Sequence, residues 1–309
     1  MAERVIIDTD IGDDIDDAQA IVMALKSPEI EIDAITTVFR NVRARAQITK
    51  HLLTLAGRDD VPVYTGCEAP LLVDVDIDAI PPQYGDELRD IPVDESTHAV
   101  DYLVETVNSN PGEITVAAIG PATNIAMALR RDPRFARNVK EVVWMGGAFY
   151  FHFRTWNAAW DPEAVRIMFE ADMPFRVVSR DVSEQCVLTA EQVEELRSGD
   201  VLVQYLSQIT DRWHAGAKRL PVLFDPLTID AIFDERYLKF RPEHVGVETR
   251  GEFTRGMTFV YNTNYFGWGV GDAVDPMSRS PVSVAHEVDG PGFVRFFMDR
   301  LLGSEGDGS

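Results

Sequence analysis

The chain has 309 residues, and its 51 Asp and Glu residues outnumber its 29 Lys and Arg residues, which gives a formal net charge of −22. This length suffices for one large α/β domain with a substantial core, and a hydrophobic share of 45 % excludes a disordered chain. Because nucleic acids and anionic membrane surfaces are bound through Lys and Arg, the charge balance excludes both as expected partners.

Lysine is rare in this chain: 5 Lys accompany 24 Arg, whereas the acidic residues comprise 30 Asp and 21 Glu. An acidic, lysine-poor composition is typical of proteins from salt-loving cytoplasms. Salt screens self-repulsion there, and a hydrated acidic surface preserves solubility. We therefore expect a source such as a halophilic archaeon, with an ordinary acidic enzyme as the alternative.

Neither the cysteines nor the amino terminus suggests export. Cys67 and Cys186 are too few for a disulfide scaffold and lack the spacing of a metal site. Residues 1–4 lead directly into a strand-like stretch and leave no room for a signal peptide. No apolar run approaches the roughly 18 residues needed to span a bilayer. We expect a soluble, cytoplasmic protein without a membrane partner.

Short apolar runs alternate with amphipathic segments through the first half of the chain. The apolar runs predict buried strands at 5–7, 30–38, 61–64, 114–119, 142–145 and 175–178. Helical spacing predicts helices at 17–26, 43–56, 96–108, 121–130 and 161–170. The remaining patterns are an acidic, proline-rich loop at 69–90, a helical region at 189–219 and a β-like region at 245–269.

This alternation predicts an α/β fold, with a single domain over residues 1–302 and a mainly parallel central sheet flanked by helices around a Rossmann-like core. Residues 303–309 are small and polar and predict a flexible tail. In such sheets ligands bind at the carboxyl ends of the strands. The residues that follow each predicted strand are therefore the first candidates for a functional site.

Residues 8–17, which read DTDIGDDIDD, place six carboxylates between the first predicted strand and the first predicted helix. One or two of them could cap the helix, but six like charges raise one another's pKa and cost stability. A hard divalent cation removes this conflict, because Ca²⁺ accepts about six to eight oxygen ligands. The stretch predicts a cation site, with a solvated acidic turn as the alternative.

Two other cation-binding motifs fit this stretch less well. An EF-hand loop counted from Asp8 would need Glu at its twelfth position, which is Gln19. A phosphatase of the haloacid-dehalogenase type also begins with a strand and Asp-x-Asp and uses Mg²⁺. It usually has Thr or Val where this chain has Gly12, and it would need a later Lys, of which the chain has only 5.

Residues 8–18 instead resemble the signature of the inosine-uridine-preferring nucleoside hydrolases, which runs Asp-Thr-Asp-x-Gly and then Asp-Asp-Ala. Further segments are similar to that family in the same order: 35–38 with Asn41, 61–66 with 70–71, 120–126, 145–148, 156–157, 161–164, 225–227 and 255–256. The ordered matches cover nearly the whole chain, so the resemblance does not depend on one motif.

The resemblance implies a Ca²⁺-dependent enzyme that hydrolyses the N-glycosidic bond of a small-molecule ribonucleoside, through an oxocarbenium-like transition state, to ribose and a free base. The implied metal ligands are Asp10, Asp17, Asp225 and the backbone oxygen of Thr123. Asp10 would also be the general base for a water whose pKa the metal lowers.

On the substrate side, the resemblance implies that Asp16 and Asn157 hydrogen-bond the ribose hydroxyls and that Asn41 lines the same pocket. It also implies a homodimer or homotetramer. Relative to the family signature, two residues are inserted after Gly12, so more than one set of metal ligands is compatible with the sequence. Alignment on the helix start selects Asp17, whereas alignment from Gly12 would select Asp13 or Asp14 instead.

Several positions depart from the family pattern. Thr155 stands where the family often has a Glu that contacts the ribose 5′ side, and Arg40 replaces a small residue before Asn41. Phe224 stands where many members have a His that protonates the leaving base. His152, within the aromatic stretch 149–160, is the nearest substitute by sequence. His214 could approach the site from the helix before Asp225.

The aromatic stretch offers Trp156 and its neighbours for stacking on a base, or for packing beneath a loop or at a subunit contact. Because of the departures, two alternatives to an ordinary ribonucleoside hydrolase stay open. One is hydrolysis of an unusual or modified riboside. The other is a non-catalytic protein that binds a nucleoside or ribose.

Overall fold

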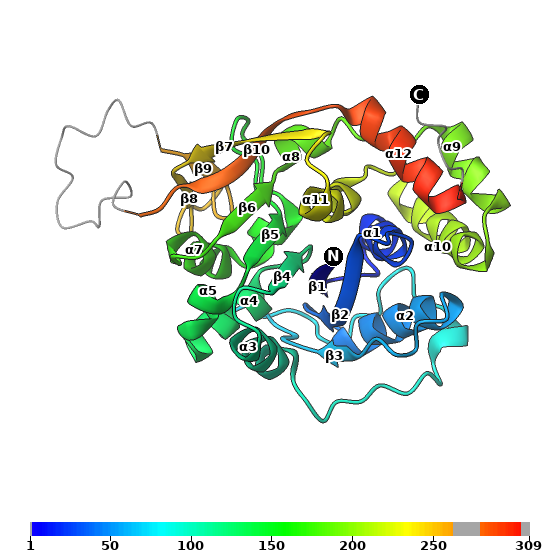
Figure 1. Ribbon diagram of the computed structural model, residues 1–309, viewed down its shortest axis with the longest axis horizontal. Helices are drawn as coiled ribbons and strands as arrows, with labels where there is room; N and C mark the ends of the chain where they lie inside the picture. Colours follow the sequence, from blue (N-terminus) through cyan, green and yellow to red (C-terminus); the bar gives the residue numbers. More distant parts are fainter. Residues whose placement is uncertain (1, 262–278, 304–309) are drawn as a thin grey trace.

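An eight-stranded sheet crosses the centre of the computed structural model, which describes residues 2–261 and 279–303 (Figure 1). Its strand order is β3-β2-β1-β4-β5-β6-β10-β7. Neighbouring strands are parallel except β10 and β7, which are antiparallel. The strands are β1 (Glu3–Thr9), β2 (Ile30–Thr37), β3 (Val63–Thr65), β4 (Ile114–Ala118), β5 (Glu141–Met145), β6 (Phe175–Val178), β7 (Leu238–Glu243) and β10 (Val282–Val288). A separate antiparallel pair joins β8 (Val245–Val247) to β9 (Thr258–Val260).

Both faces of the sheet are covered by helices. Ile7 of β1 packs into one apolar cluster and Ile6 into the other, as the two-residue period of a strand requires. The first cluster is closed by α1 (Asp16–Leu25), α2 (Val42–Leu55), α10 (Val201–Ala217), α11 (Phe224–Phe233) and α12 (Gly290–Leu302). The second is closed by α3 (Ala99–Ser109), α4 (Thr123–Arg131), α5 (Arg134–Asn138) and α7 (Pro162–Glu170). The shorter helices are α6 (Trp156–Trp160), α8 (Arg180–Ser183) and α9 (Ala190–Glu195), with 3₁₀ turns at Asp86–Leu88 and Leu196–Ser198.

The architecture confirms the predicted α/β fold with a mostly parallel sheet. Each of the six predicted strands is present, and the predicted helices of the first half lie between them. The helical region 189–219 divides into α9, a 3₁₀ turn and α10. The β-like region 245–269 contributes β8 and β9, and its end lies outside the described residues. Residues 304–309 of the predicted tail also lie outside them.

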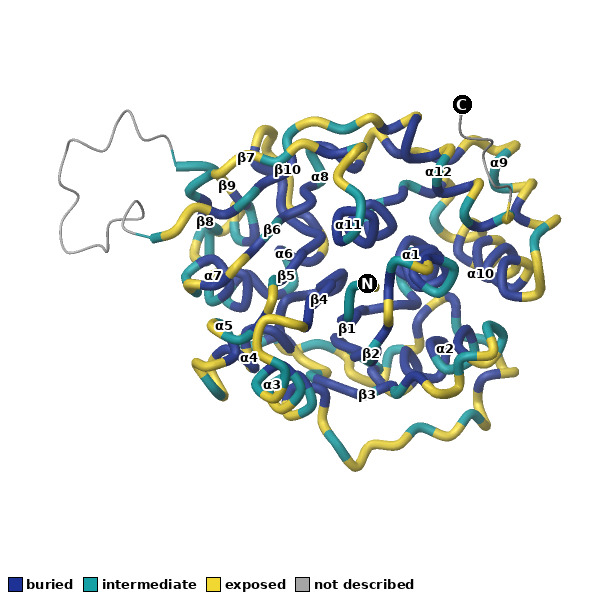
Figure 2. Tube along the Cα trace, viewed as in Figure 1, coloured by how far each residue is buried: buried dark blue, intermediate teal, exposed yellow. Residues whose placement is uncertain are grey.

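Strand register brings the ends of β1, β2 and β4 level, since Asp8 is paired with Thr36 on one side and Ala118 on the other. The loops that follow these strands therefore meet at one edge. Figure 2 shows the strands buried at the centre, whereas the long connection between β3 and α3 runs largely exposed along the outside. No helix within residues 2–261 and 279–303 is long and apolar enough to cross a bilayer.

Candidate active site

A cavity of about 700 Å³ opens at the carboxyl edge of the sheet. Its lining comes from the loops after β1, β4, β5 and β6, as expected for a parallel sheet, from the first turns of α1 and α11, and from α10 and the connection that follows it. The described lining consists of Asp10, Asp13, Asp14, Asp16, Asp17, Ile119, Met145, Thr155, Trp156, Asn157, Arg180, Glu184, Trp213, Arg219, Val222, Phe224 and Asp225.

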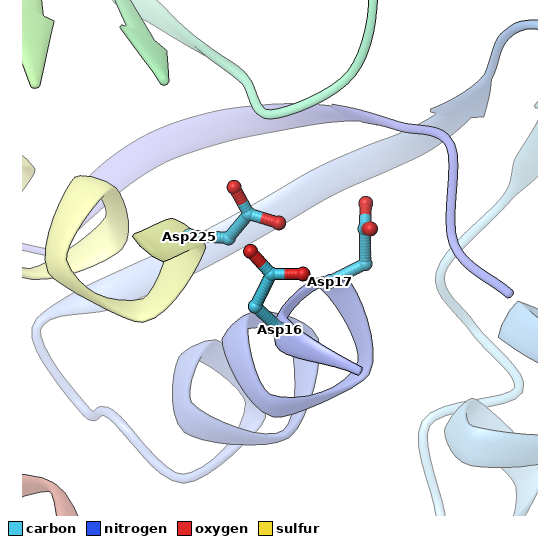
Figure 3. A group of neighbouring side chains, drawn as sticks. All are labelled: Asp16, Asp17 and Asp225. Carbon is cyan, nitrogen blue, oxygen red and sulfur yellow. The ribbon is translucent and has the colours of Figure 1, made fainter. Parts of the chain in front are cut away.

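Three buried carboxylates meet in this cavity (Figure 3). Asp16 and Asp17 open α1, and Asp225 lies in the first turn of α11, which packs against α1. One oxygen from each lies within 4.8 Å of the others. Both helix amino termini favour negative charge, because their first backbone N–H groups lack partners within the helix. Two helices thus bring distant parts of the chain into one acidic cluster.

The cluster fits a hard cation. Asp16, Asp17 and Asp225 are at most 6 % exposed. Burial is the main reason that the pKa of each lies well above its usual range, and repulsion from neighbouring carboxylates adds to the shift. Three carboxylates supply only oxygen donors, which are the ligands that hard divalent cations such as Ca²⁺ and Mg²⁺ prefer. A bound divalent cation would remove the repulsion that burial otherwise intensifies.

Asp10 follows β1 directly and faces the same cavity, where it is 3 % exposed. Its Oδ2 accepts a hydrogen bond of 3.0 Å from Nε1 of Trp156. Burial raises the pKa of Asp10 to about 6, against the opposing charge of Arg45. A carboxylate that lines the cavity in this way could accept a proton from a bound molecule.

Arg45, a side chain only 1 % exposed, holds the loop that carries the acidic motif. Its guanidinium donates to the backbone oxygens of Asp10 and Ile11 and pairs with Asp13 at 2.7 Å. Gly120 permits the close approach of the neighbouring loop, since a Cβ there would lie 2.9 Å from the backbone nitrogen of Asp10. The buried guanidinium of Arg45 and the close backbone contact at Gly120 therefore fix the position of the loop.

The remaining carboxylates of residues 8–17 have other partners. Asp13 pairs with Arg45, and Asp14 pairs with Arg219. Asp8 is fully buried and does not belong to the described lining. Its Oδ1 accepts hydrogen bonds from Thr36 and Asn124, and burial raises its pKa to about 7. This arrangement favours alignment on Asp16 and Asp17, and it weighs against Asp8 as a phosphatase nucleophile.

Besides Asp16, three predicted substrate-binding residues line the cavity. Nδ2 of Asn157 donates to the backbone oxygens of Ile119 and Met145, at 2.8 and 3.0 Å, so Oδ1 of the same amide is the atom that can meet a ligand. Thr155 accepts a hydrogen bond from the backbone N–H of Gly147. Trp156, 46 % exposed, contacts the acidic motif through its hydrogen bond to Asp10.

Three other predicted site residues lie outside the described lining. Asn41 caps α2: its Oδ1 accepts from the backbone N–H of Ala44, and its Nδ2 donates to the backbone oxygen of Asp78. Asn41 does not belong to the described lining, and its side chain completes a helix end; that it lines the pocket when substrate is bound stays a prediction. The hydroxyl of Thr123 donates to Asp161, and His152 is exposed.

Two of the sequence's other suggestions are placed as follows. His214 approaches the backbone oxygen of Arg219, and it does not belong to the described lining. Arg40 has its guanidinium 5.0 Å from the ring centres of both Phe39 and Trp160. Phe39 and Arg40 both have positive φ angles, which are uncommon outside glycine. The guanidinium of Arg40 thus packs against aromatic rings beside the cavity.

Sequence reasoning missed five residues of functional interest: Arg45, Arg180, Glu184, Trp213 and Arg219. Arg180 had a usable signal, since it follows the predicted strand 175–178 and so belongs to the carboxyl edge of the sheet. The others lie on helices and loops whose orientation depends on tertiary packing, and no local pattern distinguishes them from surface residues.

Comparison with known proteins agrees with this geometry. Residues 5–295 match the family model described as inosine-uridine preferring nucleoside hydrolase. A probable uridine nucleosidase 2 of Arabidopsis thaliana is 36 % identical, with 98 % of each chain covered. The pyrimidine-specific ribonucleoside hydrolase RihA of Citrobacter koseri is 32 % identical, with 97 % of this chain and 98 % of that protein covered.

A solved structure has the same fold. The plant nucleoside hydrolase PpNRh1 superposes with a TM-score of 0.86 at 33 % identity, over 98 % of this chain and 99 % of the plant chain. Fold, buried carboxylate cluster and full-length similarity thus point the same way. The chain belongs to the inosine-uridine preferring nucleoside hydrolase family, whose members are N-glycosyl hydrolases.

Proposed function

We propose that this protein hydrolyses the N-glycosidic bond of ribonucleosides and that Ca²⁺ is its metal. The observation that carries the proposal is the meeting of Asp16, Asp17 and Asp225 in one cavity beside Asp10. Relatives named as uridine nucleosidases and pyrimidine-specific ribonucleoside hydrolases support a nucleoside substrate. The proposed metal ligands remain Asp10, Asp17, Asp225 and the backbone oxygen of Thr123.

When bound, the cation would orient the ribose hydroxyls and make a water molecule more acidic. Asp10 would accept the proton of the attacking water, while Trp156 donates to its Oδ2 and holds the carboxylate in place. Asp16 and Asn157 would hydrogen-bond the ribose and favour the flattened, positively charged sugar of the transition state. Asp16 is also close enough to Asp17 and Asp225 to serve as a metal ligand.

The test is release of reducing sugar from a panel of purine and pyrimidine ribonucleosides, with and without a calcium chelator. Molar KCl is the starting buffer, because the acidic, lysine-poor composition supports adaptation to salt. We expect chelator-sensitive release that calcium restores. No release by folded, calcium-loaded protein would reject the proposal and favour a non-catalytic binder or an unusual riboside.

Sugar choice gives a second readout of the same proposal. A ribose held through its 2′-hydroxyl should be cleaved about a hundredfold faster than the 2′-deoxyribose analogue, because both metal and hydrogen-bond contacts are lost. Uridine and 2′-deoxyuridine form the matched pair. Equal rates would exclude recognition of the sugar by the acidic cluster.

We also propose that the protein is a homodimer or homotetramer, which family resemblance supports. Gel filtration coupled to light scattering can measure this oligomeric state.

A further inference from the structure

Outside the acidic motif, the described lining of the cavity contains few groups that could receive a departing base. Among the described lining residues, the only cationic side chains are Arg180 and Arg219, and none is His, Lys or Tyr. Arg219 pairs with Asp14 of the acidic motif. Arg180 is therefore the one described lining cation whose ion-pair partner lies outside the acidic motif.

The backbone of Arg180 is anchored beside Thr155. Arg180 begins α8 immediately after Ser179, and its N–H donates to the backbone oxygen of Gly147 at 2.9 Å. The N–H of Gly147 in turn donates to Oγ1 of Thr155 at 2.9 Å. Gly147 thus connects Arg180 to Thr155, which lines the pocket from a different loop.

The guanidinium of Arg180 is also fixed. Its Nε and Nη2 contact one carboxylate oxygen of Glu184, one helical turn further along. Its Cζ lies 3.7 Å from the ring centre of Phe153 and 5.8 Å from that of Phe224. Since Glu184 occupies the side edge of the fork, the outer Nη1–Nη2 edge can donate to a second partner.

Phe224 connects this fork to the acidic cluster. It immediately precedes Asp225 in the first turn of α11, and both residues line the cavity. The guanidinium of Arg180 therefore lies beside the Phe224 ring, and Phe224 is the chain neighbour of Asp225 in the cluster. Phe224 and Arg180 thus border the part of the cavity next to Asp225.

We infer that Arg180 binds a carbonyl oxygen of the leaving base and stabilises the negative charge that the base gains as it departs; the inference rests on the proposed function. When the C1′–N bond breaks, its electron pair leaves with the base and spreads onto the carbonyl oxygen. Water forms the new C1′–O bond, its proton passes to Asp10, and the departed base takes a proton from solvent. Arg180 stays protonated and stabilises the negative charge by donating hydrogen bonds. Glu184 is a positioning residue that orients the fork.

The test compares two leaving groups in the full-length, calcium-loaded protein. Uridine releases a base that has ring carbonyls, whereas p-nitrophenyl ribofuranoside releases an acidic phenol that leaves without such help. We expect Arg180→Met to lower kcat/KM for uridine by about 10- to 100-fold, the value of a charged hydrogen bond. The loss on the nitrophenyl riboside should be at least about tenfold smaller. Arg180→Lys, which keeps the charge without the fork, should be intermediate for uridine.

Arg166→Met is the matched control, because Arg166 pairs with Glu170 at the same helical spacing on α7 and does not line the cavity. It should leave both substrates unaffected. Equal losses on both substrates in Arg180→Met would assign Arg180 to the ribose or to the fold, and an unchanged uridine rate would remove it from the site. Either result overturns the inference while the proposed function stands. Wild-type protein that hydrolyses neither compound would reject the proposed function and this inference with it.

Discussion

In the acidic cluster of the cavity, Asp16, Asp17 and Asp225 are at most 6 % exposed and offer only hydrogen-bond acceptors. Elsewhere in the lining, Arg180 and Glu184 neutralise each other, with side chains 28 % and 42 % exposed. Buried carboxylates need a cation to remain charged together, whereas an ion pair whose Arg packs on aromatic rings needs no added ion. The residues of the acidic cluster are therefore constrained by the need for a cation. The Arg180–Glu184 pair, in which we infer that Arg180 contacts the base, has no such constraint and can set specificity.

The largest effect should come from the acidic motif. Asp10→Asn should lower kcat for uridine by about 10²–10⁴-fold, because an amide cannot accept the proton of the attacking water. The variant keeps an oxygen that can accept from Nε1 of Trp156, so its melting temperature should stay close to that of the wild type. Asp86→Asn, at a carboxylate whose side chain is 94 % exposed, is the control. Retained activity in Asp10→Asn would place the general base elsewhere.

Metal removal should distinguish the acidic cluster from Arg180 through its effect on the melting temperature. A ligand at a hundred times its dissociation constant stabilises the folded state by about 2.7 kcal/mol, so calcium should raise the melting temperature of chelated protein by about 5 °C or more. Asp225→Asn should lose most of this increase. Arg180→Met should retain it, because Arg180 does not contribute to the cluster. Differential scanning fluorimetry with and without calcium measures both, and equal calcium shifts in all three proteins would place the cation elsewhere.

A smaller effect should follow from changing the lining beside Arg180. Phe224→His introduces a titratable group beside the space assigned to the base, so it should raise turnover of inosine by about tenfold below pH 6.5. The gain should disappear as pH rises and the imidazole loses its proton. The wild type should lack this alkaline decline, since no histidine belongs to the described lining. Phe224→Leu controls for the loss of the ring, and a pH-independent gain in Phe224→His would exclude proton donation.

Local sequence predicted the fold well, because buried strands and amphipathic helices produce short-range patterns. The pattern did not predict that β10 inserts between β6 and β7, parallel to one and antiparallel to the other. Such placement depends on contacts between distant segments. The sequence also left α11 unassigned, although Asp225 was identified through resemblance, since an apolar helix buried on most sides has little amphipathic period.

The site was predictable where function resides in a compact motif, as in residues 8–17. It was not predictable where one polar side chain has several possible roles. Asn41 follows a strand and resembles a pocket residue, and its side chain also caps α2, a role that the resemblance did not indicate. Arg180 and Glu184 have the spacing of an ordinary surface ion pair, the same as Arg166 and Glu170. Only the position of α8 at the carboxyl edge separates the two pairs.

The smallest expected effect concerns Asp230, a buried carboxyl group on the same helix as Asp225 but apart from the cluster. It is fully buried, and neither carboxylate oxygen has a hydrogen-bond partner among the described residues. Burial raises its pKa to about 8 from a usual value of 3.8. Between these values the folded state binds more protons than the unfolded state, so the free energy of unfolding falls as pH rises from about 4 to 8.

Asp230→Asn removes this titration and should stabilise the protein by about 1–3 kcal/mol at pH 8, with a smaller gain at pH 5. Urea unfolding at both pH values, in saturating calcium, measures the difference, and activity should stay within about twofold of wild type. The clustered carboxylates need a cation to be charged, whereas the isolated one remains protonated at the cost of stability. A gain that is equal at pH 5 and pH 8 would show that Asp230 is not the group that titrates, and would remove this contrast between buried carboxylates inside and outside the cavity.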